Sequence, residues 1–344
     1  MGERFDTTRA RLEQWEGVLA RVAATRPDPE ITLRLDSVRG ALAETPPPEP
    51  ARWAFDDPEA AWLHGSSRQV LAAAERLFDP DPFGGGVADV ERRREVSERL
   101  AALAETSEWG EAWTAARSRI AASERYAGLD LPVQDGLLPL GPDPESGLEE
   151  FWHVASGARP VASADGPGRW AIDGATGIVV VLVPGGTWTM GAQTTDPDAP
   201  HYDPLTSGGV APVHPVRLDP FFIGRYELTR GQRVRLTGSA PDAPDLDRVT
   251  GPLAYPTESL SLERAVAVLA RVGLSVPTEA QWEVAARAGS SAPVPWSGDD
   301  FSAVANLADA RFEREATVRG MAFAADVDDG SPGRAPVGSY RPNA

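Results

Sequence analysis

The stretch 274–289, LSVPTEAQWEVAARAG, constrains the fold most, because it marks both ends of one short helix. Pro277 excludes helix before it, and Thr278 and Gln281 have the T-x-x-Q spacing of a capping box. Gly289 favours the left-handed conformation that commonly ends a helix. We therefore expect a helix that starts at Thr278 and ends near Gly289.

One face of this helix should be buried. Trp282, Ala285 and Ala286 follow one another at the i, i+3 and i+4 positions that share a helical face. A tryptophan on such a stripe is usually part of a core. The sequence therefore predicts a structural anchor with Trp282 at its centre, and no catalysis.

The composition excludes several classes of chemistry. All 33 basic residues are arginine, so no lysine is present for a P-loop, a kinase or a Schiff base. With no cysteine there is no disulfide, no thiolate nucleophile and no cysteine-based metal site. The 51 acidic residues give a net charge of −18, which argues against nucleic acid as a partner.

The sequence also shows no membrane segment. Its longest apolar run, residues 178–183, is far shorter than the roughly 18 residues that a membrane helix needs. Acidic residues stand near the N-terminus where a signal peptide would have an apolar core. We expect a cytoplasmic protein.

Residues 1–130 should form a helical linker or interaction region. Apolar residues recur at helical spacing from Thr8 onward, in 35–42, after Asp57, and in 90–124 with a break near Ser107. A proline-rich linker, residues 44–50, separates the second and third of these helices. A coiled-coil dimerisation segment is the alternative in 90–124, although no sustained heptad is evident.

Short β-segments should follow in a connecting region, residues 131–177. From residue 178 the pattern predicts a hairpin, with a buried strand over 178–183, a Pro-Gly-Gly turn and a returning strand over 187–190. A later helix within 257–273 should be capped by Ser259 or Ser261 and end at Gly273.

Several segments resemble the formylglycine-generating enzyme (sulfatase-modifying factor) family. They are IVVVLVPGGTWTMG, APVHPVRLDPFFIGRYELTRGQ, PTEAQWEVAARAG, VPWSGDD, ANLAD and DDGSPGRAPVGSYRPN, in that order. The resemblance implies an α+β fold, in which residues 178–344 form the N-terminal part of a loop-rich, C-type-lectin-like mixed domain. Ser261-Leu262 stands where the family has a tryptophan, which weakens inference about a substrate groove.

The resemblance also implies a structural calcium site. By position, the family's ligands correspond to Asn306, Leu307, Asp329 and Ser331. Carboxylate, amide and carbonyl oxygens suit this hard cation. A solvated acidic loop without an ion is the alternative. An EF-hand is rejected, since Val337 occupies the position of its bidentate glutamate.

The family resemblance implies a copper-dependent oxidation of a substrate cysteine, carried out by a cysteine pair that lies beyond the segments matched here. Copper is not expected in this chain, because the soft metal needs thiolates that it lacks. The segments 51–65 and 135–157 resemble regions of bacterial proteins that also carry a Ser/Thr protein kinase domain. Two hypotheses follow: an incomplete, inactive copy of the enzyme domain, or a non-catalytic binding or regulatory module with a protein or peptide partner in a kinase-linked system.

Histidine offers no competing site. His214 is expected to be a loop residue bonded to the backbone, and His201 lies in a mobile-looking Pro/Asp loop. No further ligands accompany either residue in the sequence, so we predict no histidine metal site.

Overall fold

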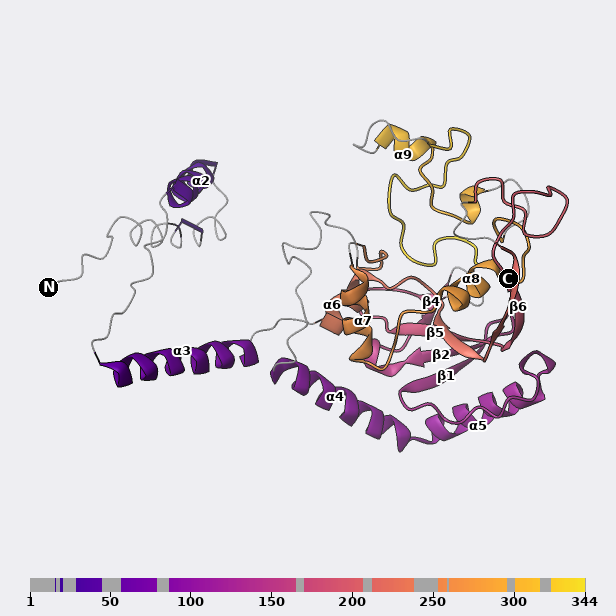
Figure 1. The fold of residues 1–344 in the computed structure, drawn as a ribbon, viewed down its shortest axis with the longest axis horizontal. Helices are drawn as coiled ribbons and strands as arrows, with labels where there is room; N and C mark the ends of the chain where they lie inside the picture. The colour runs from indigo at the N-terminus through magenta and orange to yellow at the C-terminus, as the bar shows by residue number, and fades with distance from the viewer. Residues whose placement is uncertain are drawn as a thin grey trace. The chain divides into compact units, whose positions relative to one another are not determined.

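The computed structural model describes residues 16, 19–20, 29–44, 57–78, 87–164, 170–206, 212–237, 253–258, 260–295, 301–315 and 323–343 (Figure 1). The helix expected from Thr8 lies outside the described residues apart from Glu16, Leu19 and Ala20. The proline-rich linker lies outside them from residue 45, and so do residues 296–300 of the VPWSGDD segment. The chain divides into two compact units, Met1–Ala72 and Ala73–Ala344.

Helix α2 (Pro29–Glu44) lies in the first unit, and helix α3 (Pro58–Phe78) begins there. The side chain of Asp57 accepts a hydrogen bond from the Glu59 amide at 3.1 Å, so α3 starts at the predicted Asp-Pro pair. None of the described helices is both long and apolar enough to cross a membrane.

After the end of α3, the second unit continues with two helices that are separated at the predicted break. Helix α4 (Val87–Ala104) ends just before Thr106, which caps helix α5 (Ser107–Ala122) by accepting from the Trp109 amide at 3.3 Å. Such a cap satisfies one of the amides that a helix start leaves without an internal partner.

Four antiparallel strands form the main sheet, in the order β1-β2-β5-β8. They are β1 (Leu137–Pro142), β2 (Glu149–His153), β5 (Ile178–Val183) and β8 (Phe221–Gly224). Every residue of β2 is buried, as expected for a central strand. The sheet thus draws strands from both the predicted connecting region and the C-terminal region.

The predicted hairpin is wrong in its pairing, although both of its strands are present. Strand β5 pairs with β2 and β8, whereas β6 (Gly186–Met190) pairs with β7 (His214–Leu218) in a separate sheet. At the turn, a side chain at Gly185 would meet Pro220 at 2.7 Å. Pro220 thus packs closely against this turn. The chain leaves the main sheet here and does not fold back to pair β6 with β5.

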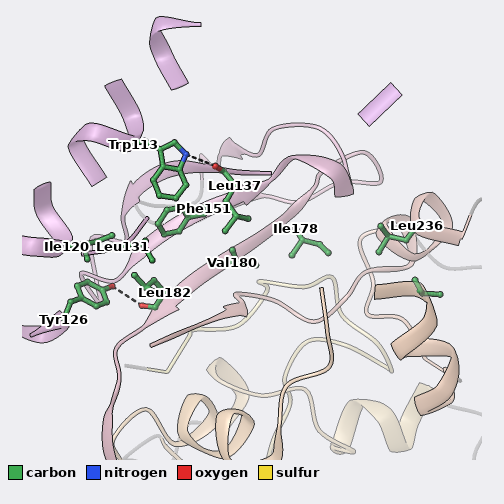
Figure 2. Close-up of a cluster of buried hydrophobic side chains, with 11 residues drawn as sticks. Trp113, Ile120, Tyr126, Leu131, Leu137, Phe151, Ile178, Val180, Leu182 and Leu236 are labelled. Carbon is green, nitrogen blue, oxygen red and sulfur yellow. Dashed lines mark hydrogen bonds between the residues drawn. The ribbon is translucent and has the colours of Figure 1, made fainter. Parts of the chain in front are cut away.

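The core lies between α5 and the main sheet and continues to Leu236 and Val268, which belong to two later helices (Figure 2). The Trp113 ring packs against Phe151 with centroids 5.5 Å apart, and its Nε1 donates to the Leu137 carbonyl at 3.0 Å. The hydroxyl of Tyr126 donates to the Leu182 carbonyl at 3.0 Å and accepts from the Glu149 amide. These hydrogen bonds satisfy the indole N–H and the phenol hydroxyl of the two buried aromatic side chains. They also fix α5 and the following turn on the sheet.

The remaining described elements are shorter. They are the 3₁₀ turns Glu124–Tyr126, Val154–Ser156 and Phe301–Ala303, the strand pair β3 (Val161–Ala162) and β4 (Trp170–Ala171), and helices α6 (Arg230–Thr237), α7 (Leu262–Ala270), α8 (Glu279–Arg287) and α9 (Ala310–Glu315). Ser261 caps α7, and Gly273 is left-handed after it, so the prediction for this helix is confirmed. The mixed α+β architecture is confirmed as well, whereas the finer C-type-lectin-like description stays a prediction.

Helix α8 has the predicted start but not the predicted buried face. Thr278 and Gln281 form a complete capping box. Trp282, however, is 62% exposed, and Val284 is the buried residue at 4%. The nine-residue helix lies against β6 along its Val284 side, where Val183 and Phe221 complete a small cluster. Packing against a neighbour that the local pattern does not specify therefore decided which face is covered.

Candidate functional site

The structure brings the predicted calcium ligands together around one carboxylate. The two oxygens of Asp329 accept hydrogen bonds from the amides of Leu307 (2.6 Å) and Ser331 (2.8 Å). Asn306 lies against the same loop, since its Nδ2 donates to the Gly333 carbonyl at 2.7 Å. Two loop segments more than twenty positions apart, residues 306–307 and 329–333, thus lie together. We call them the loop pair.

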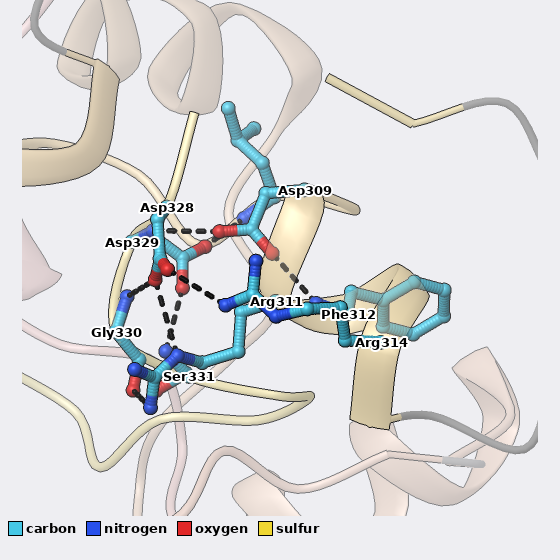
Figure 3. Close-up of polar contacts among 9 residues, drawn as sticks. Asp309, Arg311, Phe312, Arg314, Asp328, Asp329, Gly330 and Ser331 are labelled. Atoms are coloured by element: carbon cyan, nitrogen blue, oxygen red, sulfur yellow. Dashed lines mark hydrogen bonds and ion pairs between the residues drawn. The ribbon is translucent and has the colours of Figure 1, made fainter. Parts of the chain in front are cut away.

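Asp309 is part of this arrangement, although sequence reasoning missed it (Figure 3). Its side chain is 0% exposed, and its two oxygens accept from the amides of Phe312 (2.8 Å) and Asp329 (2.6 Å). Burial alone would raise the pKa of Asp309, but the backbone amides that donate to it, including that of Arg311, hold the pKa below its ordinary value. The D-x-x-F spacing of a helix cap was the available signal.

Asp328 has a different environment from its two acidic neighbours. Its carboxylate pairs with Arg311 Nε at 3.1 Å and with Arg314 at 3.0 Å. The Arg314 hydrogen bond, followed by the Gly330 amide, lowers the pKa of Asp328. Because both arginines lie on α9, this carboxylate is already neutralised by cations of the chain itself.

Tyr340 places a buried hydroxyl beside the side chains of Ser331 and Asp329, although no described residue meets it in full hydrogen-bond geometry. The Tyr340 oxygen is buried close to Ser331 and Asp329, and burial raises the pKa of its phenol. Buried polar atoms are nearly always paired, and Ser331 and Asp329 are the polar side chains nearest to this hydroxyl. The phenol therefore belongs to the polar surroundings of the Asp329 carboxylate.

The residues present fit a hard cation better than a soft one. Among the described residues no group of three or more His, Cys, Asp or Glu is placed to hold a metal. An ion here would therefore draw on the Asp329 carboxylate, the Asn306 amide oxygen and main-chain carbonyls. Each Asp329 oxygen accepts one described amide and keeps a second lone pair. Such an all-oxygen donor set suits calcium.

A second buried polar cluster lies at the main sheet, and the sequence pattern did not predict it. Arg225, which follows β8, pairs with Glu150 of β2 and, at 3.2 Å, with Asp143. Desolvation raises the pKa of Glu150, against the opposing charge of Arg225. Trp170 Nε1 donates to Glu150 at 2.9 Å. The cluster joins strands across the sheet, and we interpret it as structural.

Exposure and backbone contacts differ among the three histidines at positions 153, 201 and 214. His214 is exposed, and its Nδ1 lies 2.7 Å from the Pro212 carbonyl, as expected for a backbone-bonded residue. The expected loop position is wrong, because His214 begins strand β7 and pairs with Met190. His201, expected in a mobile-looking loop, is buried with a left-handed φ of 64°. His153 is buried in β2, and its Nε2 lies 3.0 Å from the Val272 carbonyl.

Comparison with known proteins gives this geometry a family context. Residues 174–344 match the family model described as the sulfatase-modifying factor enzyme 1-like domain. These residues carry a sulfatase-modifying factor-like domain. The chain is also 31% identical over 211 residues to a formylglycine-generating enzyme of Thermomonospora curvata, and 29% identical over 212 residues to one of Streptomyces coelicolor.

The two relatives are longer than the matched part of this chain. The alignments cover 48% and 47% of the chain, and they span 65% and 62% of the relatives. Among solved structures, PvdO from Pseudomonas aeruginosa covers 50% of the chain and 67% of its own length, at 24% identity and a TM-score of 0.37.

Within the sulfatase-modifying factor-like domain, the loop pair around Asp329 is thus the candidate site. All four residues predicted as ligands lie in it or against it, and Asp309 and Tyr340 join them. Strands β1 and β2 and helices α4 and α5 precede the matched residues, yet β2 supplies the central neighbour of β5. Strand β5, the first strand of the matched domain, therefore pairs on one side with a strand that lies outside the family match.

Proposed function

We propose that this chain supplies the folded, ion-binding part of a sulfatase-modifying factor-like domain and does not itself oxidise cysteine. The observation that carries the proposal is that residues 174–344 match the domain while the 344 residues contain no cysteine. Copper-dependent oxidation needs thiolates to hold the soft metal. No residue of this chain can take that role.

The test is an oxidation assay with a cysteine-containing peptide, copper and oxygen. The formylglycine-generating enzyme of Thermomonospora curvata serves as the positive control. Mass spectrometry should detect formylglycine with the control and none above background with this chain. Turnover by this chain would overturn the proposal.

We further propose that Asn306, Leu307, Asp329 and Ser331 hold a structural calcium ion. The carboxylate of Asp329, which accepts amides from both Leu307 and Ser331, supports this assignment. Calcium would stabilise a segment that has little regular structure, since a ligand that binds only the folded state raises its stability.

Calorimetric titration of the chain with calcium tests the site directly. We expect binding by the wild type, weaker binding by Asp329→Asn, and unchanged binding by Asp326→Asn. Asp326 is the matched control because it is exposed on the same acidic loop and is not among the predicted ligands. The absence of both binding heat and a calcium-dependent thermal shift would remove the site.

The second candidate function is a non-catalytic binding or regulatory module of a kinase-linked protein. The exposure of Trp282 on α8 favours it, because tryptophan is enriched at the centres of protein interfaces. A bacterial Ser/Thr protein kinase domain should bind the wild-type chain in a surface-capture assay and bind Trp282→Ala more weakly. Equal capture of both variants, or no capture of either, would count against this function.

A further inference from the structure

Helix α9 is joined to the candidate calcium loop through a buried carboxylate. One oxygen of Asp309 accepts from Phe312, within the helix, and the other accepts from Asp329, on the loop (Figure 3). The main chain adds a bond from the Ala310 amide to the Val327 carbonyl at 3.1 Å. The start of α9 and the position of Asp329 therefore depend on the same side chain.

A second connection lies on the exposed side of the helix. Arg311 and Arg314 both reach the carboxylate of Asp328, and Arg311 also donates to the Gly330 carbonyl at 3.3 Å. Exposed ion pairs contribute little to stability one at a time. Here two arginines from one helix converge on one loop carboxylate, so they constrain the orientation of the loop relative to the helix.

The same loop residues are the predicted ligands. Asp329 accepts from Leu307 and Ser331 through the carboxylate that would face the ion. A shift of α9 would move the Asp329 amide that Asp309 holds, and would change the distance between the two halves of the ligand set. Six to eight oxygens must converge on a calcium ion, so such a shift weakens binding.

We infer that cation binding at this loop and the seating of helix α9 are coupled, with Asp309 as the positioning residue that joins them. The inference rests on the calcium site proposed above and assigns Asp309 and the two arginines roles that are distinct from coordination. Coupling between binding and a conformational equilibrium is reciprocal. Calcium should therefore stabilise α9, and disruption of the α9 contacts should weaken calcium binding.

Hydrogen exchange of the full chain measures the first half of this relation. Amides of residues 310–315 should exchange more slowly with calcium than without it, while those of α5 should be unaffected. Magnesium at the same concentration serves as the control for ionic strength and charge. Unchanged exchange in α9 at a calcium concentration that saturates the site would overturn the coupling.

Calcium titrations of two variants measure the reverse effect, the dependence of calcium binding on the α9 contacts. Asp309→Asn should bind calcium about tenfold more weakly than the wild type. Because Asp309 is buried, the variant can fail to fold. The exposed double variant Arg311→Gln/Arg314→Gln provides an independent measurement.

The double variant also separates coupling from simple electrostatics. Removing two positive charges near the ion would strengthen binding if only charge mattered. Coupling predicts weaker binding, by about three- to tenfold. Binding equal to or stronger than that of the wild type would overturn the inference and leave the calcium site in place. If the wild type binds no calcium, the proposed site fails and the inference fails with it.

Discussion

Asn343 caps helix α8 from the far end of the chain: its Nδ2 donates to the Ala285 carbonyl at 2.8 Å, and also to the next carbonyl, at 3.0 Å. The last carbonyls of a helix have no partner within it, and side chains or water must satisfy them. Here a side-chain amide more than fifty positions away takes that role. The capping box of Thr278 closes the other end of the same helix.

We expect Asn343→Ala to lower the free energy of unfolding by about 1–2 kcal/mol, because it leaves two helix carbonyls without this donor. Asn343→Asp has nearly the same shape but no amide donor, and it places a negative charge at the helix C-terminus. It should be at least as destabilising. Urea unfolding followed by circular dichroism measures both changes. Wild-type stability in both variants would show that water replaces the side chain without loss.

Removing the Arg225 cation from the cluster at the main sheet should lower the free energy of unfolding more than the loss of the Asn343 cap does. Arg225→Met leaves the carboxylates of Glu150 and Asp143 buried without their cationic partner. The free energy of unfolding should fall by about 3–5 kcal/mol. Adding Glu150→Gln should recover part of the loss, since one buried charge is then removed. Arg94→Ala, in an exposed pair with Glu98, is the control and should change stability by less than about 0.5 kcal/mol. Equal effects of the two arginine substitutions would contradict the buried-pair interpretation.

The buried imidazole of His153 should make the fold sensitive to acid. Desolvation lowers its pKa below the ordinary value of about 6.5, despite the bond to the Val272 carbonyl. A histidine kept neutral in the folded state binds fewer protons there than in the unfolded state. Its contribution to stability is therefore complete above about pH 6.5 and is lost as the pH falls toward the folded-state pKa.

Urea midpoints measured between pH 7.5 and pH 5 test this dependence. His153→Gln can still donate to the Val272 carbonyl but does not titrate, so its stability should change less over this range than that of the wild type. His214→Gln, at an exposed position, serves as the control for the His-to-Gln substitution itself. Identical slopes in the wild type and His153→Gln would contradict the prediction.

Two glycines inside helices should respond to alanine with opposite signs. A Cβ at Gly231 in α6 would lie 2.7 Å from the Gly174 carbonyl oxygen, a backbone atom that cannot move away cheaply. A Cβ at Gly110 in α5 meets nothing within 4 Å. We expect Gly231→Ala to destabilise by about 1–3 kcal/mol and Gly110→Ala to stabilise by about 0.5–1 kcal/mol. Thermal unfolding measures both, and a stabilised Gly231→Ala would be inconsistent with this close approach.

The features that the sequence alone determined are those whose partners lie within one helical turn. The Thr278–Gln281 capping box and the Ser261 cap depend on bonds between residues three positions apart, and each formed as the spacing predicts. The two strands after residue 178 were also predictable, because runs of β-branched residues and turn glycines are local signals.

Tertiary structure alone decided which elements meet. Strand β5 paired with β2 and β8 and not with the strand that follows it, and Val284 replaced Trp282 on the buried face of α8. The resemblance named four residues of the candidate site, but neither it nor the local pattern indicated that Asp309 joins α9 to Asp329. Strand pairing, buried faces and shared carboxylates depend on contacts between distant residues. Those contacts form only when the packing of the whole unit outweighs local preference.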